Sequence, residues 1–97
     1  MIFEWDSVKN NENIKKHGVS FEAAQEIFDG PTMTRQDKTL EYGEERFTSI
    51  GLIEGFMMIL VAHTDREGIT RIISARKALP RERRLFHEYL SKGSQSY

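Results

Sequence analysis

Arginine and lysine side chains are spaced along the later part of the chain in a way that suits a bound phosphate. The segment 71–77 reads RIISARK, and 81–84 reads RERR. This pattern predicts a cationic β-strand, a turn, and a helix that begins with more cations. Between Arg66 and His87 there are seven Arg or Lys residues against two Glu, a local balance of +5. Cations fixed on a strand indicate a polyanion surface, with nucleic acid as the first partner to test.

Arg71 and Arg76 are the strongest candidates for holding a phosphate. A guanidinium group makes two parallel charge-assisted hydrogen bonds to phosphate and stays charged at any cellular pH. The two residues are five apart, so an ideal strand would project them from opposite faces. A bulge near Ser74 would bring them to one side, and the sequence leaves both arrangements open. Arg46 adds a third cation, while an ion pair with an acid such as Glu45 is the structural alternative for Arg71.

His63 directly follows the most apolar predicted strand, where functional sites often form. Its imidazole suits proton transfer near neutral pH, although a single histidine is also common as a structural residue. His17 lies next to a predicted helix C-terminus, where carbonyl dipoles favour a cation. His87 is expected on the surface of the last helix. Neither His17 nor His87 requires a catalytic explanation.

Several other chemistries fit the sequence poorly. There is no cysteine, and His63 and Asp65 are the only near-adjacent pair of potential metal ligands. The seven glycines are scattered singly, and Ser74 lacks the context of a nucleophile elbow. We therefore expect no metal and no cofactor. A site of Lys, Arg and His can assist attack of an RNA 2′-hydroxyl on its own phosphate, which needs a base, an acid and stabilising cations.

Length and charge bound the kind of protein. Ninety-seven residues make one domain, which we place at 1–91, followed by a frayed tail at 92–97. Residues 1–65 carry six Lys or Arg and twelve Asp or Glu, whereas residues 66–97 carry eight and three. The acidic N-terminus does not resemble a signal peptide, and the longest apolar run, 56–62, is too short to span a bilayer. We expect a cytoplasmic protein.

The elements that position these residues follow from local signals. A strand at 2–5 precedes a helix that starts at Asp6 or Ser7 and stops at Gly18. This helix has few apolar residues, so we expect it at the surface, with Lys9, Asn10 and Asn13 available for contacts with a partner. Ser20 caps a second helix. Strands are expected at 32–39, 46–52, 56–62 and 69–76, with a hairpin-like connection at 41–44, and Pro80 begins the last helix. This order predicts an α+β fold with a small antiparallel sheet, two N-terminal helices and one C-terminal helix.

Motifs along most of the chain resemble the BrnT family. The N-terminal half carries FEWD at 3–6, then Lys9, Asn13, KHGVSFEA at 16–23 and Phe28-Asp29. The C-terminal half carries ERF at 45–47, Ile50-Gly51, His63-Thr64, Arg66, RIISAR at 71–76 and ERR at 82–84. The resemblance covers residues 2 to 90. Leu79-Pro80 departs from the small or polar residues usual before the last helix, which weakens the expected helix cap.

The resemblance implies a toxin of a type II toxin–antitoxin pair, with a RelE-like ribonuclease fold and RNA cleavage that needs no metal. It implies a BrnA-type antitoxin that neutralises the toxin and brings DNA binding to the complex, so that DNA is contacted only indirectly. A toxin dimer within a heterotetramer with the antitoxin is an expectation from the resemblance alone. From the family motifs, the resemblance implies that the catalytic residues are Lys9, Arg46, His63, Arg71 and Arg76. Further RNA contacts are expected from Lys77, Arg81 and Arg84.

Two functions from different classes remain for this surface. The leading hypothesis is an endoribonuclease toxin, with Lys9 or His63 as general base or acid. The other is a binding module for nucleic acid or protein that has no catalytic activity. A DNA-binding regulator lacks support, because the strand-rich middle predicts no helix-turn-helix pair.

Overall fold

The computed structural model describes residues 1–37 and 44–93, and within them five strands form one sheet in the order β1-β5-β4-β3-β2. The strands are β1 (Ile2–Glu4), β2 (Met33–Asp37), β3 (Arg46–Ile53), β4 (Met57–Arg66) and β5 (Ile69–Lys77). The helices are α1 (Ser7–His17), α2 (Phe21–Ala24), the 3-10 helix η1 (Gln25–Asp29) and α3 (Pro80–Gly93). The expected α+β class and order of elements are confirmed. The expected connection at 41–44 falls almost entirely outside the described residues. Of the expected tail at 92–97, residues 92 and 93 belong to α3 and the rest lies outside the described residues.

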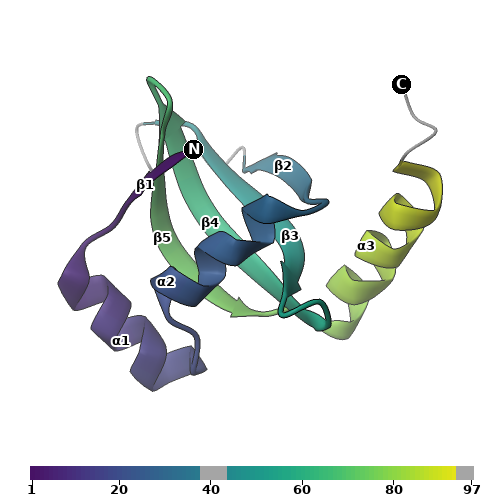
Figure 1. The fold of residues 1–97 in the computed structure, drawn as a ribbon, viewed down its shortest axis with the longest axis horizontal. Helices are drawn as coiled ribbons and strands as arrows, with labels where there is room; N and C mark the ends of the chain where they lie inside the picture. The colour runs from purple at the N-terminus through teal and green to yellow at the C-terminus, as the bar shows by residue number, and fades with distance from the viewer. Residues whose placement is uncertain (38–43, 94–97) are drawn as a thin grey trace.

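The sheet is mixed rather than wholly antiparallel. Strands β2 to β5 form the expected antiparallel meander, but β1 pairs with β5 in parallel, with Glu4 opposite Arg71. The three-residue β1 lies beside β5, the strand most distant from it in sequence (Figure 1). No local pattern specifies such a pairing, because it depends on where the chain returns after sixty residues.

Local capping signals fix the helix boundaries. Asp6 Oδ1 accepts hydrogen bonds from the backbone N–H groups of Val8 and Lys9, at 2.8 and 3.1 Å. Gly18, in the left-handed region with φ 73°, ends α1, and Ser20 Oγ caps α2 by accepting from Ala23 N–H. At α3, the Glu82 carboxylate accepts from Leu79 N–H at 2.8 Å. This carboxylate replaces the small polar cap that Leu79-Pro80 lacks.

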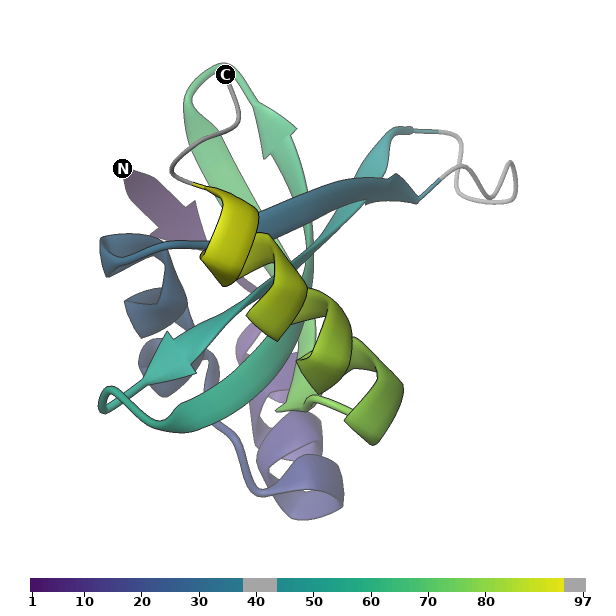
Figure 2. The same ribbon diagram turned by 90° about the vertical axis from the view of Figure 1, so that its right-hand side faces the viewer.

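The hydrophobic core lies between the sheet and the helices α2 and η1. Phe21, Ala24 and Ile27 pack on strand residues that include Val61 and Ile72. We call this side of the sheet the core face. Helix α3 lies across the opposite side (Figure 2), where Phe86 is buried outside this core cluster.

Helix α1 is attached to the sheet by buried asparagines, contrary to the prediction that they are available at the surface. Asn13 Nδ2 donates to the carbonyls of Val19 and Ala75, both at 2.8 Å, and its Oδ1 accepts from Ala75 N–H. Asn10 Oδ1 accepts from Phe21 N–H. Because β1 pairs only with the first three residues of β5, Asn13 satisfies backbone groups further along that edge. The polar side chains thus anchor the helix where apolar ones are scarce.

Candidate nucleic-acid interface

A β-bulge places Arg71 and Arg76 on the same face of the sheet. Arg71 pairs with Thr64 and Ile72 with His63, but Ser74 pairs with Ala62, so Ile73 is an extra residue in β5. The side chains alternate normally on each side of this shift, and Arg71 and Arg76 therefore both point away from the core. The bulge lies beside Ser74, where the sequence allowed it without requiring it.

The same face carries every arginine of the described strands. The register places Arg46 opposite Asp37 and next to the Phe47–His63 pair, and Arg35 opposite Thr48. With Arg66 at the end of β4, five arginines from four strands share one side, which we call the arginine face: Arg35, Arg46, Arg66, Arg71 and Arg76. The hydroxyls of Thr48, Thr64 and Ser74 lie between them on that face. Helix α3 covers the end near Arg76 and leaves the opposite end open (Figure 2).

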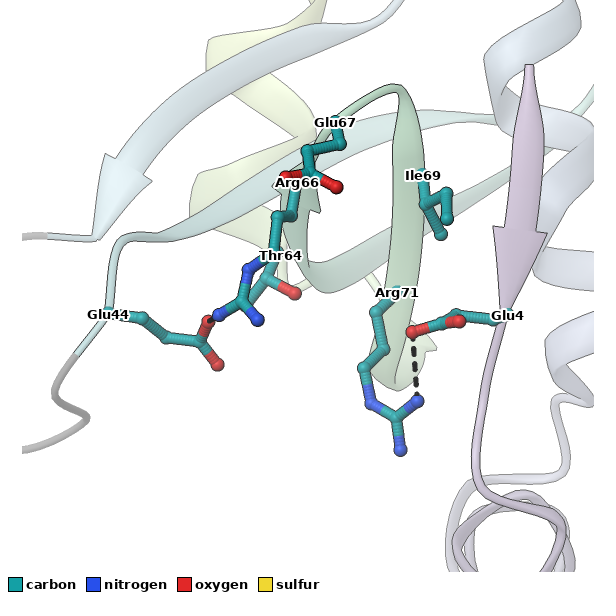
Figure 3. A pocket seen from close by; sticks show the side chains of 7 residues that line it. All are labelled: Glu4, Glu44, Thr64, Arg66, Glu67, Ile69 and Arg71. Atoms are coloured by element: carbon teal, nitrogen blue, oxygen red, sulfur yellow. Dashed lines mark hydrogen bonds and ion pairs between the residues drawn. The ribbon is translucent and has the colours of Figure 1, made fainter.

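A pocket of about 350 Å³ opens between Arg66 and Arg71 at the uncovered end (Figure 3). Each arginine extends toward a glutamate: Arg71 Nη1 lies 3.0 Å from Glu4 Oε2, and Arg66 pairs with Glu44. Arg71 therefore does have an acid partner, but it comes from β1 and is not Glu45. The Arg71 side chain is 47% exposed. Such exposed pairs contribute only about 0–1 kcal/mol, so a phosphate can displace the glutamate at little cost.

Arg76 is held much more firmly. It makes a bidentate ion pair with Glu82 of α3, with Nη–Oε distances of 2.8 and 2.9 Å. The hydrogen bonds from Arg76 hold the pKa of Glu82 below its usual range, and the same pairing raises the pKa of Arg76. Since Glu82 also caps α3, this pair joins the sheet to the last helix. Arg76 lies on the arginine face, but its guanidinium is already paired with Glu82.

Lys9 of α1 and Arg71 of β5 both act on the Asp6 carboxyl. Hydrogen bonds from the Lys9 and Val8 backbone N–H groups hold the pKa of the Asp6 carboxyl below its usual range, and the charges of Lys9 and Arg71 lower it further. Both cations therefore lie near one carboxylate. Helix α1 also brings Lys9 to a hollow that Ser74 of β5 lines.

His63 lies on the core face and is separated from the arginines by the sheet. Its side chain is 2% exposed, stacked on Phe47 and contacted edge-on by Phe28. Asp65 Oδ1 lies 2.9 Å from Nδ1 and Ser49 Oγ lies 2.8 Å from Nε2. The carboxylate can only accept, so Nδ1 donates to Asp65, and in the neutral imidazole Nε2 accepts from Ser49.

The Ser49–His63–Asp65 order resembles a hydrolase triad, but its serine is fully buried and bonded to Thr34 Oγ1 at 2.7 Å. A nucleophile must reach its substrate, and Ser49 cannot do so in this arrangement. The chain of hydrogen bonds supports the packing of β2, β3 and β4, which sequence reasoning did not foresee because Ser49 is distant from His63 in sequence.

The predicted RNA contacts surround the start of α3. Lys77 is the last residue of β5, and Arg81 and Arg84 lie in the first two turns of α3, all three exposed. They extend the positive charge beyond Arg76. Within residues 1–37 and 44–93, no three His, Asp or Glu side chains gather where they could hold a metal ion. No helix in this described part is long and apolar enough to cross a membrane.

The protein is a small α+β domain whose strand arginines lie on one face of the sheet. This arrangement is typical of a nucleic-acid-binding protein. The family model for the ribonuclease toxin BrnT of type II toxin–antitoxin systems matches residues 5–82. The chain belongs to the BrnT family, as its motifs predicted. No curated protein matches it.

A solved relative supports this assignment. The crystal structure of the Brucella abortus ribonuclease toxin BrnT superposes with a TM-score of 0.62 at 27% sequence identity. The match covers 81% of this chain and 99% of the Brucella chain. The likeness therefore extends over nearly the whole of that toxin.

Proposed function

We propose that this protein is a metal-independent endoribonuclease toxin that arrests growth by cleaving RNA and thereby inhibiting translation. The observation that carries the proposal is the bulge in β5, which places both Arg71 and Arg76 on the face that holds the other strand arginines. Phosphoryl transfer within RNA depends on positioning and on cations that stabilise charge in the transition state. Family membership supplies the ribonuclease class.

The residues divide into different roles within this proposal. Arg71, with an exposed and weak ion pair, binds a phosphate of the RNA, and Arg46 assists from the same face. Lys9 transfers a proton. His63, buried on the core face, positions the strands and does not contact RNA. Arg76 both contributes positive charge to this face and anchors α3 through Glu82. Lys77, Arg81 and Arg84 contact the RNA on either side of the cleaved bond.

Partner proposals rest on the family. A BrnA-type antitoxin neutralises the toxin in the cytoplasm, and the complex contacts DNA only through the antitoxin. A toxin dimer within a heterotetramer is the assembly that this pairing favours.

Purified protein incubated with RNA in EDTA tests the activity. We expect cleavage in EDTA and growth arrest on expression, both lost in an Arg46→Ala/Arg71→Ala double variant that retains its fold by circular dichroism. Retardation of RNA without cleavage would instead establish the non-catalytic binding module. Cleavage that stops in EDTA and returns with added magnesium would overturn metal independence.

A further inference from the structure

A second hollow lies where α1 meets the bulge of β5. It has a volume of about 200 Å³ and is lined by Lys9, Glu12, Asn13, Lys16, His17, Ile73 and Ser74. Residues 9, 13 and 16 lie on one side of α1 because they are four and three residues apart. Asn13 is held by Val19 and Ala75, so the helix carries its cations in a fixed position against β5.

The charges in this hollow differ from those of the pocket between Arg66 and Arg71. In that pocket each arginine is paired with a glutamate. In the described part of the chain, neither Lys9 nor Lys16 takes part in a salt bridge, and Glu12 is the one acid in the lining. An incoming phosphodiester can therefore bind Lys9 and Lys16 without displacing a salt bridge, although the carboxylates of Asp6 and Glu12 lie nearby.

His17 adds a group that can move a proton. It is half-buried in the last turn of α1, and the Ser74 hydroxyl lies across the hollow on the bulged strand. An imidazole is the side chain most often used for proton transfer in an active site. The sequence alone did not show that Lys9 and Lys16 share the surroundings of His17.

We infer that this hollow is the site where the scissile RNA phosphodiester is cleaved, with His17 as the general base; the inference rests on the proposed ribonuclease function. Neutral His17 accepts the proton of the 2′-hydroxyl, and O2′ forms a bond to phosphorus. The P–O5′ bond breaks, and O5′ takes a proton from the Lys9 ammonium. The products are a 2′,3′-cyclic phosphate and a 5′-hydroxyl, and solvent carries the proton from His17 back to Lys9. Lys16 and Ser74 hold the non-bridging oxygens.

The test compares cleavage with binding. Cleavage uses an RNA oligonucleotide that spans a wild-type cut site, and binding uses the same oligonucleotide with a 2′-deoxyribose at that site. We expect His17→Ala to cleave about 10²–10⁴-fold more slowly while binding the deoxy analogue as wild type does. Added imidazole should restore part of the rate to this variant alone. Lys16→Gln should weaken analogue binding, whereas Lys15→Gln, the same change outside the hollow, should alter neither readout.

The results separate the proposed ribonuclease function from the proposed role of His17 and its hollow. Wild-type protein that cuts no RNA defeats the proposed function itself. If wild type cuts RNA, three results for His17→Ala overturn the role of His17 alone. The first is a cleavage rate equal to that of wild type. The others are a loss of analogue binding as large as the loss of cleavage rate, and a loss of cleavage rate that imidazole does not rescue. Equal effects of Lys15→Gln and Lys16→Gln would remove the hollow as the phosphate site.

Discussion

Arg71 and Arg76 share a face of the sheet but differ in how their acid partners hold them. The pair between Arg71 and Glu4 is monodentate and about half exposed on both sides. The pair between Arg76 and Glu82 is bidentate, and the Glu82 side chain is only 14% exposed. Water screens the first pair far more than the second, so loss of Arg71 separates function from stability better than loss of Arg76 does.

Arg71→Ala should remove activity without unfolding the protein. We expect cleavage to fall by about 10²-fold, the order of one lost charge-assisted contact to a phosphate. The free energy of unfolding should change by at most about 1 kcal/mol. Cleavage assays together with urea denaturation measure both quantities. Glu4→Gln, which removes the acid and keeps the arginine, is the matched control and should retain cleavage. An Arg71→Ala variant as active as wild type would contradict the phosphate grip.

Glu82→Gln should destabilise the protein in a pH-dependent way. The pKa of Glu82 is lowered in the folded state, so its ionised pair stabilises the fold above the usual glutamate pKa, about 4.3. This contribution is lost as the pH falls through the lower, folded value. We expect a cost of about 1–2 kcal/mol at pH 7. Urea denaturation from pH 7 to 3 should show the gap between wild type and variant narrowing below pH 4.3. A constant gap would refute the assignment.

Among the elements, α1 depends on one polar side chain for its place beside β5. The helix has few apolar residues, and Val8 and Ile14 are exposed. Asn13 provides the link, because its amide joins α1 to Val19 and to both backbone groups of Ala75. The position of Lys9, Lys16 and His17 against the bulged strand therefore depends on Asn13.

Asn13→Ala should cost about 2–3 kcal/mol of unfolding free energy, since it leaves buried backbone groups of β5 without partners. Asn11→Ala is the matched control, because Asn11 lies exposed on the same helix, and its effect should stay within about 0.5 kcal/mol. Urea denaturation midpoints compare the two. Equal midpoints would show that Asn13 does not anchor the helix.

For the whole molecule, the arginines of four strands lie on one face of the sheet, although the net charge is only −1. Glu4, Glu44 and Glu82 pair with three of these arginines, so a bound polyanion competes with carboxylates. A polyanion that binds there releases its own counterions, so affinity falls with salt in proportion to the phosphates neutralised.

RNA binding should consequently weaken steeply with salt. If four phosphates of a single strand are neutralised, affinity for the 2′-deoxy analogue should drop about 50-fold between 50 and 200 mM salt. Fluorescence anisotropy across a salt series measures the slope. Arg71→Ala should reduce the slope by the share of one phosphate, and Lys15→Gln should leave it unchanged. A salt-independent affinity would exclude the arginine face as the RNA surface.

Local signals in the sequence were enough to predict the elements and the family. Asp6, Gly18, Ser20 and Pro80 mark helix boundaries through interactions within a few residues, so these boundaries could be predicted. The motifs spread over the chain identified the family for the same reason: they can be read residue by residue. Arg46, Arg71 and Lys9 were chosen at this level, and the structure places Arg46 and Arg71 on the same face of the sheet.

Which of these residues lie near one another depends on the tertiary structure and could not be predicted from the sequence. The extra residue Ile73 brings Arg76 to the side of Arg71, β1 supplies Glu4, and α1 brings His17 and Lys16 to Ser74. It also buries His63 on the core face, away from the arginines. Each of these outcomes depends on contacts between residues far apart in the chain. Side-chain direction in a strand reverses with a one-residue shift of register, and such a shift leaves no mark in the local sequence.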